Sequence, residues 1–206
     1  MCSAAASSSG SSDDAPGREA IIHAAVDLVG RGGPDGTTVR AVAERADVSA
    51  ALVIHHFGSK AGLIEACDAH VRVTISAAAD AITEDPRGGG VQALLGHTDL
   101  GPALAYVARS LQSGGEVGRW WFAELLEVTD RMLPALVESG VARRPDDPEM
   151  TALLLMAMEV GLLLMRPLVE ERLGGDLTDE AVLARWARAE LDLLSHALLI
   201  DREDVR

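Results

Sequence analysis

The segment from Thr37 to Lys60 constrains the fold of this chain most tightly, because it encodes two short helices separated by a turn. Apolar residues recur in its first half at the spacing of one helix face. They are Val39, Val42, Ala43 and Ala46. Thr37 or Thr38 can cap this helix, and Ser49 can cap the next, by accepting hydrogen bonds from free backbone N–H groups. Two short helices joined by such a turn predict a helix-turn-helix, whose second helix enters the major groove of DNA.

Three short sequences within this segment carry a resemblance to a known family. They are TVRAVA from Thr38 to Ala43, ADVS from Ala46 to Ser49, and HFGSKAGL from His56 to Leu63. Together they resemble the N-terminal domain of the tetracycline-repressor (TetR) family, over roughly residues 18 to 72. The HFGSK ending separates this family from other helix-turn-helix families. The resemblance implies a three-helix DNA-binding domain followed by a helical ligand-binding and dimerisation domain.

Two positions depart from the pattern of that family. Asp47 stands where the family usually has Gly, but Asp tolerates the left-handed backbone of such a turn better than most residues. Ile54 stands where the family usually places a Tyr that touches a DNA phosphate. That phosphate contact is therefore absent from this chain.

The composition predicts an all-α chain with about nine helices. Ala, Leu, Glu and Arg recur at intervals of three and four, and only 3% of the residues are aromatic. We expect a disordered tail over residues 1–15, a helix-turn-helix domain over 16–60 and a ligand-binding and dimerisation domain over 61–206. The first helix is expected at 16–30, and a connecting helix at 60–83. The alternative for the tail is an arm that reaches DNA, but the tail holds two Asp and no basic residue.

The second half of the chain predicts five further helices. Their expected ranges are 91–95, 101–112, 116–139, 148–173 and 178–200. Asp147-Pro148-Glu149 is a strong start signal, and Pro167 should kink the helix that follows. That helix is apolar nearly all round, so it must be covered on every side. The last two helices of two copies would cover each other as an antiparallel four-helix interface, and the resemblance implies the same homodimer.

The expected DNA contacts fall into two groups. Arg40 has a guanidinium fork that matches guanine O6 and N7, so we expect it to read a base. Apolar contact with thymine methyl groups is expected from Ala50, Ala51 and Leu52. Hydroxyl, imidazole and ammonium groups donate to phosphate oxygens, and the candidates are Thr38, Ser49, His55, His56 and Lys60. For His56, a packed position inside the small core is an equal alternative.

The charge of the chain is unusual for a DNA-binding protein. The net charge is −14, but residues 16–72 carry only −1 of it and residues 73–206 carry −11. A strongly basic domain would be the usual electrostatic footprint of DNA binding. We therefore expect modest non-specific affinity and binding that depends on two copies acting together.

Large side chains in the second half are candidates for the lining of a ligand cavity. The expected lining residues are Tyr106, Arg109, Trp120, Trp121, Leu125, Met132, Met158 and Leu162. Pockets are mainly apolar with a few polar anchors, and Met is common at adaptable binding surfaces. The alternative is that each of these residues belongs to an ordinary core. A pocket is favoured for the domain because the resembling family uses this region as its sensor.

These features and the resemblance indicate a transcriptional regulator, most often a repressor in that family. A small apolar or amphipathic ligand would release it from a palindromic double-stranded operator. The alternatives are an activator, a member that senses no small molecule, and a helical enzyme. No Ser-His-Asp arrangement, phosphate loop or paired-carboxylate motif supports an enzyme. No cofactor or metal is expected, since the adjacent His55 and His56 would point about 100° apart on a helix.

A cytoplasmic location is expected. Charged residues interrupt each apolar run, so no segment is expected to cross a membrane, and the N-terminus lacks the pattern of a signal peptide. Cys2 and Cys67 make no disulfide framework and fit a reducing compartment. A core position is favoured for Cys67 over a redox or nucleophilic role with His70.

Overall fold

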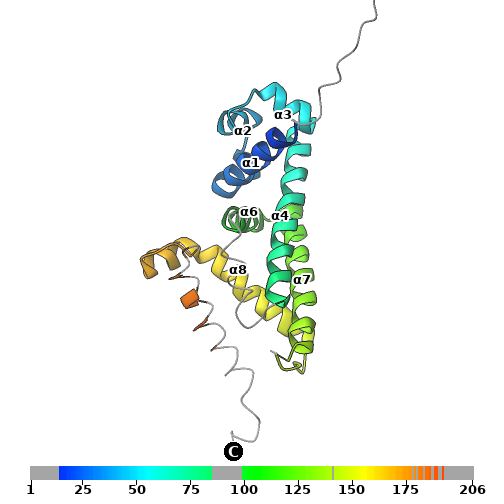
Figure 1. Ribbon diagram of the computed structural model, residues 1–206, viewed down its shortest axis with the longest axis vertical. Coiled ribbons are helices and arrows are strands. Elements are labelled where there is room, and N and C mark those ends of the chain that lie inside the picture. Colours follow the sequence, from blue (N-terminus) through cyan, green and yellow to red (C-terminus); the bar gives the residue numbers. More distant parts are fainter. Residues whose placement is uncertain are drawn as a thin grey trace, which may run out of the picture.

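The computed structural model describes residues 14–84, 99–140 and 142–177, together with scattered positions between 179 and 192. Seven helices have defined bounds within this part of the chain and it holds no strand, which confirms the all-α class. The helices are α1 (Asp14–Gly36), α2 (Val39–Arg45), α3 (Ala50–Phe57), α4 (Lys60–Glu84), α6 (Leu100–Ser113), α7 (Gly115–Glu138) and α8 (Pro148–Leu173). Figure 1 shows an elongated molecule with α1, α2 and α3 at one end. The expected helix at 91–95 and most of the tail lie outside the described residues.

The first helix is longer than the sequence predicted. α1 begins at Asp14, before the expected start at Pro16, and continues past Gly30, where we expected it to stop. A Cβ atom on Gly30 would lie 3.1 Å from the Cβ of Ala105 and 3.3 Å from the backbone nitrogen of Tyr106. Gly30 therefore lets α1 approach α6 closely. The regular helix breaks instead at Gly33, whose φ of 81° and ψ of 164° suit a residue without a side chain.

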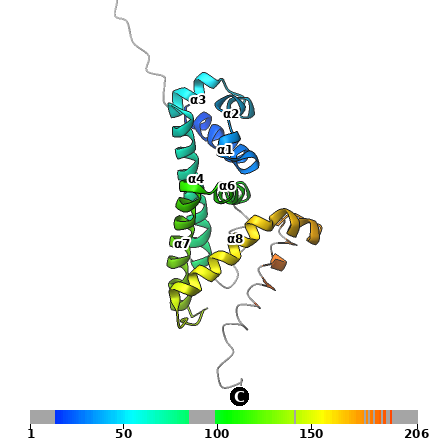
Figure 2. The ribbon, with the colours of Figure 1, turned by 180° about the vertical axis from the view of Figure 1, so that it is seen from behind.

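A continuous buried cluster runs from the three-helix end into the C-terminal helices. It includes Val42 and Val53 of the helix-turn-helix, Val71 of α4, and Tyr106 and Trp121 of α6 and α7. α1 packs more extensively against α6 than against α2 or α3, and Figure 2 shows α6 directly beside it. The packing therefore crosses the expected domain boundary near residue 60.

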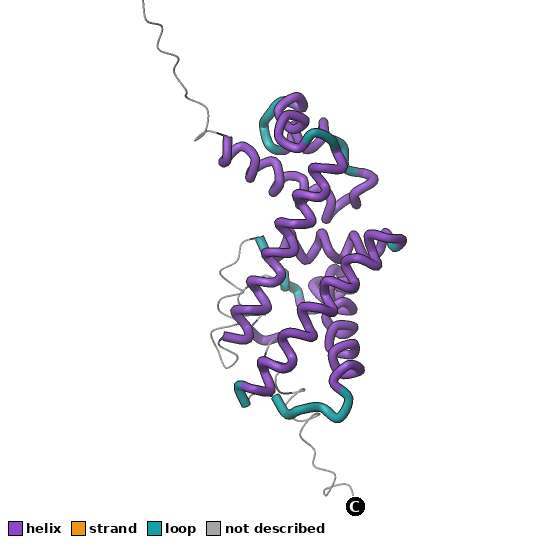
Figure 3. The backbone as a smooth tube through the Cα atoms, turned by 90° about the vertical axis from the view of Figure 1, so that its right-hand side faces the viewer, coloured by secondary structure: helices purple, strands orange, loops and turns teal. Residues whose placement is uncertain are grey.

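The long helices α4 and α7 form one side of the molecule. They pack along each other, and Figures 1 and 2 both show them side by side. α4 starts at the predicted Lys60 and buries the face that its apolar period predicts, including Leu63, Cys67 and Ile75. Figure 3 shows that only short loops join the helices at the head of the molecule. α4 is thus the continuous connection from the helix-turn-helix to the rest of the chain.

α8 begins where the Asp147-Pro148 signal predicts. The carboxylate of Asp147 accepts a hydrogen bond from the backbone N–H of Met150 at 3.1 Å, and Pro148 opens the first turn. Figures 1 and 2 show the ribbon of α8 changing direction in its C-terminal part, where Pro167 lies. Six of the large apolar side chains of this helix are exposed. They are Met150, Leu154, Met158, Leu164, Met165 and Leu168.

The composition of α8 makes it a candidate membrane span within the described residues. Pro148–Leu173 is long and apolar enough by length and composition alone, but the core helix of a soluble protein passes the same test, so the expectation that no segment crosses a membrane is not overturned. The mean hydropathy of its most apolar 18-residue window is 1.9, and 11% of that window is buried. Glu149, Glu159 and Arg166 interrupt the apolar run, as the sequence predicted. The apolar surface of α8 therefore needs cover that the other described residues do not supply.

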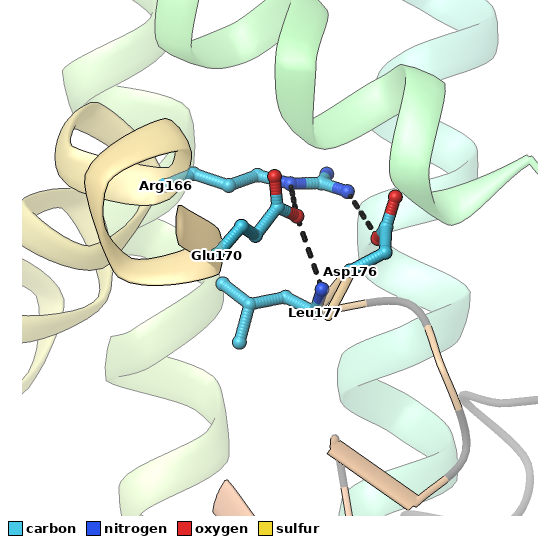
Figure 4. Close-up of polar contacts among 4 residues, drawn as sticks. All are labelled: Arg166, Glu170, Asp176 and Leu177. Atoms are coloured by element: carbon cyan, nitrogen blue, oxygen red, sulfur yellow. Dashed lines mark hydrogen bonds and ion pairs between the residues drawn. The ribbon is translucent and has the colours of Figure 1, made fainter. Parts of the chain in front are cut away.

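A polar cluster fixes the segment that follows α8 (Figure 4). Arg166 donates from Nε to Glu170 at 2.6 Å and from Nη2 to Asp176 at 2.9 Å. The backbone N–H of Leu177 donates to the same Glu170 carboxylate at 3.0 Å. Gly174, with a φ of 71°, ends the helix as its sequence predicted. Most of the expected last helix at 178–200 lies outside the described residues, and its described positions from 181 onward are helical.

Candidate DNA-binding surface

Side-chain caps define the start of both short helices. The Thr38 hydroxyl accepts a hydrogen bond from the N–H of Ala41, and the Ser49 hydroxyl accepts one from the N–H of Leu52, both at 3.1 Å. Thr37 is buried instead and donates to the Gly33 carbonyl at 2.9 Å, so Thr38 is the cap. Because each capping hydroxyl accepts, its own hydrogen stays available for a phosphate oxygen.

The turn between α2 and α3 has the backbone that the sequence predicted. Asp47 adopts a φ of 55°, the left-handed region that Asp enters more readily than most residues. The Val48 N–H donates to the Ala43 carbonyl at 2.9 Å, and this bond closes the turn. The turn thereby sets the direction in which α3 leaves α2.

The junction between α3 and α4 depends on Gly62. The Ser59 hydroxyl accepts the N–H of Gly62 at 3.1 Å, which caps α4 as the sequence predicted. A Cβ atom on Gly62 would collide with the backbone carbonyl oxygen of Phe57. Gly58, with a φ of 71°, makes the sharp bend between the two helices. The angle between α3 and the connecting helix α4 therefore depends on the close approach of Gly62 to the Phe57 carbonyl oxygen.

The expected contact residues present an exposed face on α2 and α3. Arg40 is exposed and makes no hydrogen bond or ion pair with any described residue. Leu52 and His56 are half-buried. The burial of His56 is therefore intermediate between an exposed phosphate contact and a packed core position, the two alternatives that the sequence left open. Ile54 is exposed where the family usually has Tyr. The other exposed candidates are Thr38, Ser49, Ala50, Ala51 and His55.

Several basic side chains near this face are engaged within the protein. Arg31 and Arg45 both form ion pairs with Asp27, at 2.9 Å and 2.8 Å. Lys60, which is half-buried, donates from Nζ to the backbone carbonyl of Asp35 at 3.3 Å. An ammonium group has three hydrogens, so this bond leaves Lys60 able to donate to a phosphate as well. Arg40 is left as the unengaged guanidinium on this face.

The expected pocket residues Tyr106 and Trp121 are core residues, each with 1% of its surface exposed. Both donate to one carboxylate oxygen of Asp68, the Tyr106 hydroxyl at 2.8 Å and the Trp121 indole nitrogen at 3.2 Å. Burial raises the pKa of Asp68, and the charge of Glu65 adds to this, while the two hydrogen bonds lower it. Burial and the Asp68 charge also raise the pKa of Tyr106. Tyr106 therefore stays a hydrogen-bond donor at neutral pH.

The remaining expected pocket residues do not converge on one enclosed space in the described part of the chain. Trp120 and Met158 are 40% and 47% exposed, and Arg109 is exposed and donates to Gln112 at 3.1 Å. Leu125, Met132 and Leu162 are half-buried. Two hollows are open and lie elsewhere, one over Arg72 to Asp80 of α4 and one beside Pro34, Lys60 and Asp68.

The sequence analysis missed Asp68. It falls between Cys67 and Val71 on the apolar face of α4, where a carboxylate is out of place. That position was the available signal, because a buried carboxylate needs donors from another element. Its donors come from α6 and α7, which the sequence alone could not align with α4.

The fold and this exposed face define the class of all-α proteins with a helix-turn-helix. Residues 21–67 match the family described as bacterial regulatory proteins, tetR family. Residues 99–200 match the tetracyclin repressor-like C-terminal domain. The chain belongs to the tetR family of bacterial regulatory proteins, as the resemblance in its sequence predicted.

Three known proteins show the extent of the similarity. RaaS, an HTH-type transcriptional regulatory protein of Mycobacterium tuberculosis, is 40% identical over 134 residues, which are 64% of this chain and 62% of RaaS. The match thus spans less than two thirds of that relative. SmeT, the repressor of the Stenotrophomonas maltophilia multidrug efflux pump SmeDEF, has a TM-score of 0.57 and 24% identity over 90% of this chain and 91% of its own. A transcriptional regulator from Rhodococcus has a TM-score of 0.59 and 18% identity, over 89% and 98%. The two structures establish the likeness of the fold.

Proposed function

We propose that this chain is a transcriptional regulator that binds a palindromic DNA operator as a homodimer. The observation that carries the proposal is the capped helix-turn-helix, whose α3 presents its N-terminal residues to solvent. In this arrangement the second helix lies in the major groove. The similarity to RaaS, a transcriptional regulatory protein, supports the same reading.

Base recognition is assigned to Arg40 and thymine contact to Ala50, Ala51 and Leu52. On the face formed by α2 and α3, Arg40 is an exposed guanidinium without a described partner, and its fork matches guanine O6 and N7. Phosphate contacts are assigned to the polar candidates around it. They are Thr38, Ser49, His55, His56 and Lys60. The caps that hold Thr38 and Ser49 also orient their hydroxyls.

Dimerisation is assigned to α8 (148–173) together with the helix expected at 178–200. The exposed apolar face of α8 supports this, since it needs cover beyond the other described residues. Two copies related by twofold symmetry would place their α3 helices about one DNA turn apart, ~34–36 Å. Two half-sites would also offset the lack of net positive charge in each DNA-binding domain.

A small apolar or amphipathic effector is proposed to weaken DNA binding, so that the regulator acts as a cytoplasmic repressor. SmeT, which shares the fold, is the repressor of a multidrug efflux pump. The alternative is a member that senses no small molecule, and the burial of Tyr106 and Trp121 in the core favours it. A thermal-shift screen with apolar compounds separates the two, because a ligand that binds the folded state raises Tm.

The test of DNA binding uses duplexes from the DNA upstream of the native gene. The wild type is expected to protect a palindromic site in a footprint and to bind it far more tightly than a scrambled duplex. Arg40→Ala should cost about 1–3 kcal/mol on this site and relax the preference at one base position. Arg143→Ala removes an exposed arginine between α7 and α8 and serves as the matched control. Equal binding of the wild type to native and scrambled duplexes would refute the proposal.

A further inference from the structure

Three side chains from separate elements meet where α1, α4 and α6 come together. His23 lies on α1, His70 on α4, and Asp99 immediately precedes α6. One ligand atom from each lies within 4.8 Å of the others. The His23 Nδ1 is 3.8 Å from the Asp99 carboxylate, and the rings of His23 and His70 are 5.1 Å apart.

These groups are the usual ligands of a divalent transition metal. Zn²⁺ takes His nitrogens at about 2.0–2.1 Å and carboxylate oxygens at about 2.0–2.2 Å, in a tetrahedral arrangement. Two imidazoles and one carboxylate leave the fourth position for water or another ligand. The three atoms need only a small contraction to reach such a geometry. His23 and His70 stand 47 positions apart in the sequence and form no local motif, so the sequence did not point to this cluster.

Two polar groups of the cluster have hydrogen-bonding capacity that the described residues leave unused. The Nε2 atom of His23 is buried and has no hydrogen-bond partner. Asp99 stands at the N-cap of α6, yet its side chain makes no capping hydrogen bond. The Glu19 carboxylate lies 4.0 Å from His23 Nε2, where it can orient the imidazole from behind. The Asp99 carboxylate, whose side chain is 44% exposed, faces the Nδ1 atom of His23 at 3.8 Å, so both groups can bind an ion placed between them.

We propose that His23, His70 and Asp99 bind a divalent transition metal such as Zn²⁺, with Glu19 positioning His23. The ion would tie the first helix of the helix-turn-helix domain to the connecting helix α4 and to the start of α6. It would thereby fix the DNA-binding end relative to the C-terminal helices. An effect of the ion on DNA binding rests on the proposed function, whereas metal binding itself does not.

Metal binding is tested on the full chain after removal of metal with a chelator. Zn²⁺ is titrated against a chromogenic chelator, and Co²⁺ is used as a probe because its visible absorption reports tetrahedral coordination. The wild type should bind one ion per chain through this site and gain thermal stability with Zn²⁺. His23→Gln and His70→Gln should each lower the affinity at least ~10-fold, and Glu19→Gln should lower it by ~10-fold through positioning.

His55→Gln is the matched control, because His55 is exposed on α3 and stands apart from the cluster. It should bind Zn²⁺ as the wild type does. Equal Zn²⁺ affinity in the wild type, His23→Gln and His70→Gln would overturn the site. Absence of Zn²⁺-dependent stabilisation and of a tetrahedral Co²⁺ spectrum in the wild type would overturn it as well.

Coupling to DNA is measured separately by fluorescence anisotropy with the footprinted duplex. Zn²⁺ should change the DNA affinity of the wild type by ~5-fold or more and leave His70→Gln unchanged, and by linkage DNA should change Zn²⁺ affinity equally. Zn²⁺ binding without any change in DNA affinity would overturn the coupling but not the site. A chain that binds Zn²⁺ but no specific DNA would overturn the proposed function, while the metal titration would still support the site.

Discussion

The Tyr106 hydroxyl donates a hydrogen bond to the Asp68 carboxylate at 2.8 Å, across the interface between α6 and α4. Trp121 of α7 donates to the same oxygen at 3.2 Å. A single carboxylate on the connecting helix thus holds one side chain from each of two C-terminal helices. A movement of α6 or α7 must either carry α4 with it or break these bonds. Asp68 is therefore a place where the C-terminal helices and the connector act on each other.

Removing the Asp68 carboxylate should destabilise the fold more than neutralising it. Asp68→Ala leaves the buried Tyr106 hydroxyl and Trp121 indole without their acceptor, at an expected cost of about 1–3 kcal/mol. Asp68→Asn keeps an oxygen at the same place and should cost less. Chemical denaturation at neutral pH measures both variants. Equal stability of Asp68→Ala and the wild type would show that the two bonds do not matter.

The pH dependence should follow the raised pKa of Asp68. The folded state binds the proton of the Asp68 carboxyl more tightly than the unfolded state does. The stability that this protonation adds to the fold is therefore fully present below the ordinary carboxyl pKa, about 3.9. It is lost as the pH rises through the raised pKa of the folded state. The free energy of unfolding of the wild type, compared with Asp68→Asn, should therefore fall as the pH rises across that interval. Denaturant titrations across the acidic range measure this difference, and a rise would contradict the assignment.

Gly62→Ala should shift or loosen the junction between α3 and α4. The new methyl group would collide with the Phe57 carbonyl oxygen, and such overpacking costs about 1–3 kcal/mol. Gly17→Ala is the matched control, since a Cβ there meets nothing within 4 Å and Ala favours the helix. Thermal unfolding should show a lower Tm only for Gly62→Ala, and specific DNA binding should fall with it.

Lys60→Ala should weaken DNA binding about equally on all sequences. The ammonium group neutralises a phosphate, so its loss should reduce the slope of log K against log salt by ~1. Lys60→Arg retains the charge and should retain the slope. Anisotropy titrations at several salt concentrations on native and scrambled duplexes measure both effects. A loss confined to the native duplex would assign Lys60 to base recognition instead.

Leu168→Glu should separate the homodimer. Leu168 is 67% exposed on α8, so a carboxylate there leaves a single copy intact but places charge in the proposed interface. Val73→Glu is the matched control, because Val73 is 65% exposed on α4, away from α8. Light scattering after size exclusion should find a monomer for Leu168→Glu and a dimer for Val73→Glu. A wild type that is already monomeric would reject the interface.

Cys67 should resist alkylation in the native protein. Burial raises the pKa of its thiol to about 12, and the Asp68 charge adds to this, so the reactive thiolate is scarce at neutral pH. In a Cys2→Ser background, a thiol reagent should modify Cys67 only after denaturant is added. Rapid modification of the native Cys2→Ser chain would place Cys67 in a more open environment.

Local features of the sequence predicted local structure well. The caps at Thr38, Ser49 and Asp147 follow from side chains that reach the next turn of their own helix. The turn at Asp47 and the apolar face of α4 also follow from neighbours within a few residues. These interactions need no knowledge of how the helices pack, so the pattern of residues was sufficient.

Contacts between distant helices could not be predicted in the same way. We expected Gly30 to end the first helix, whereas it lies inside α1 and allows close packing against α6. We expected Tyr106 and Trp121 in a pocket lining, and the sequence did not show that their polar atoms bind Asp68 on another helix. His23 and His70 meet only because α1 and α4 fold together. Each case depends on the relative position of two helices, which a periodic pattern does not contain.

The uninterrupted core has a consequence for the autonomy of the DNA-binding end. α1 contributes Ile21 and Val29 to a cluster that also holds Ala103 and Tyr106. In a fragment truncated after residue 60, the apolar side of α1 that packs against α6 would be exposed to solvent. The helix-turn-helix end is thus not a self-contained domain, and a chimaera that joins it to another regulator would have to include α6.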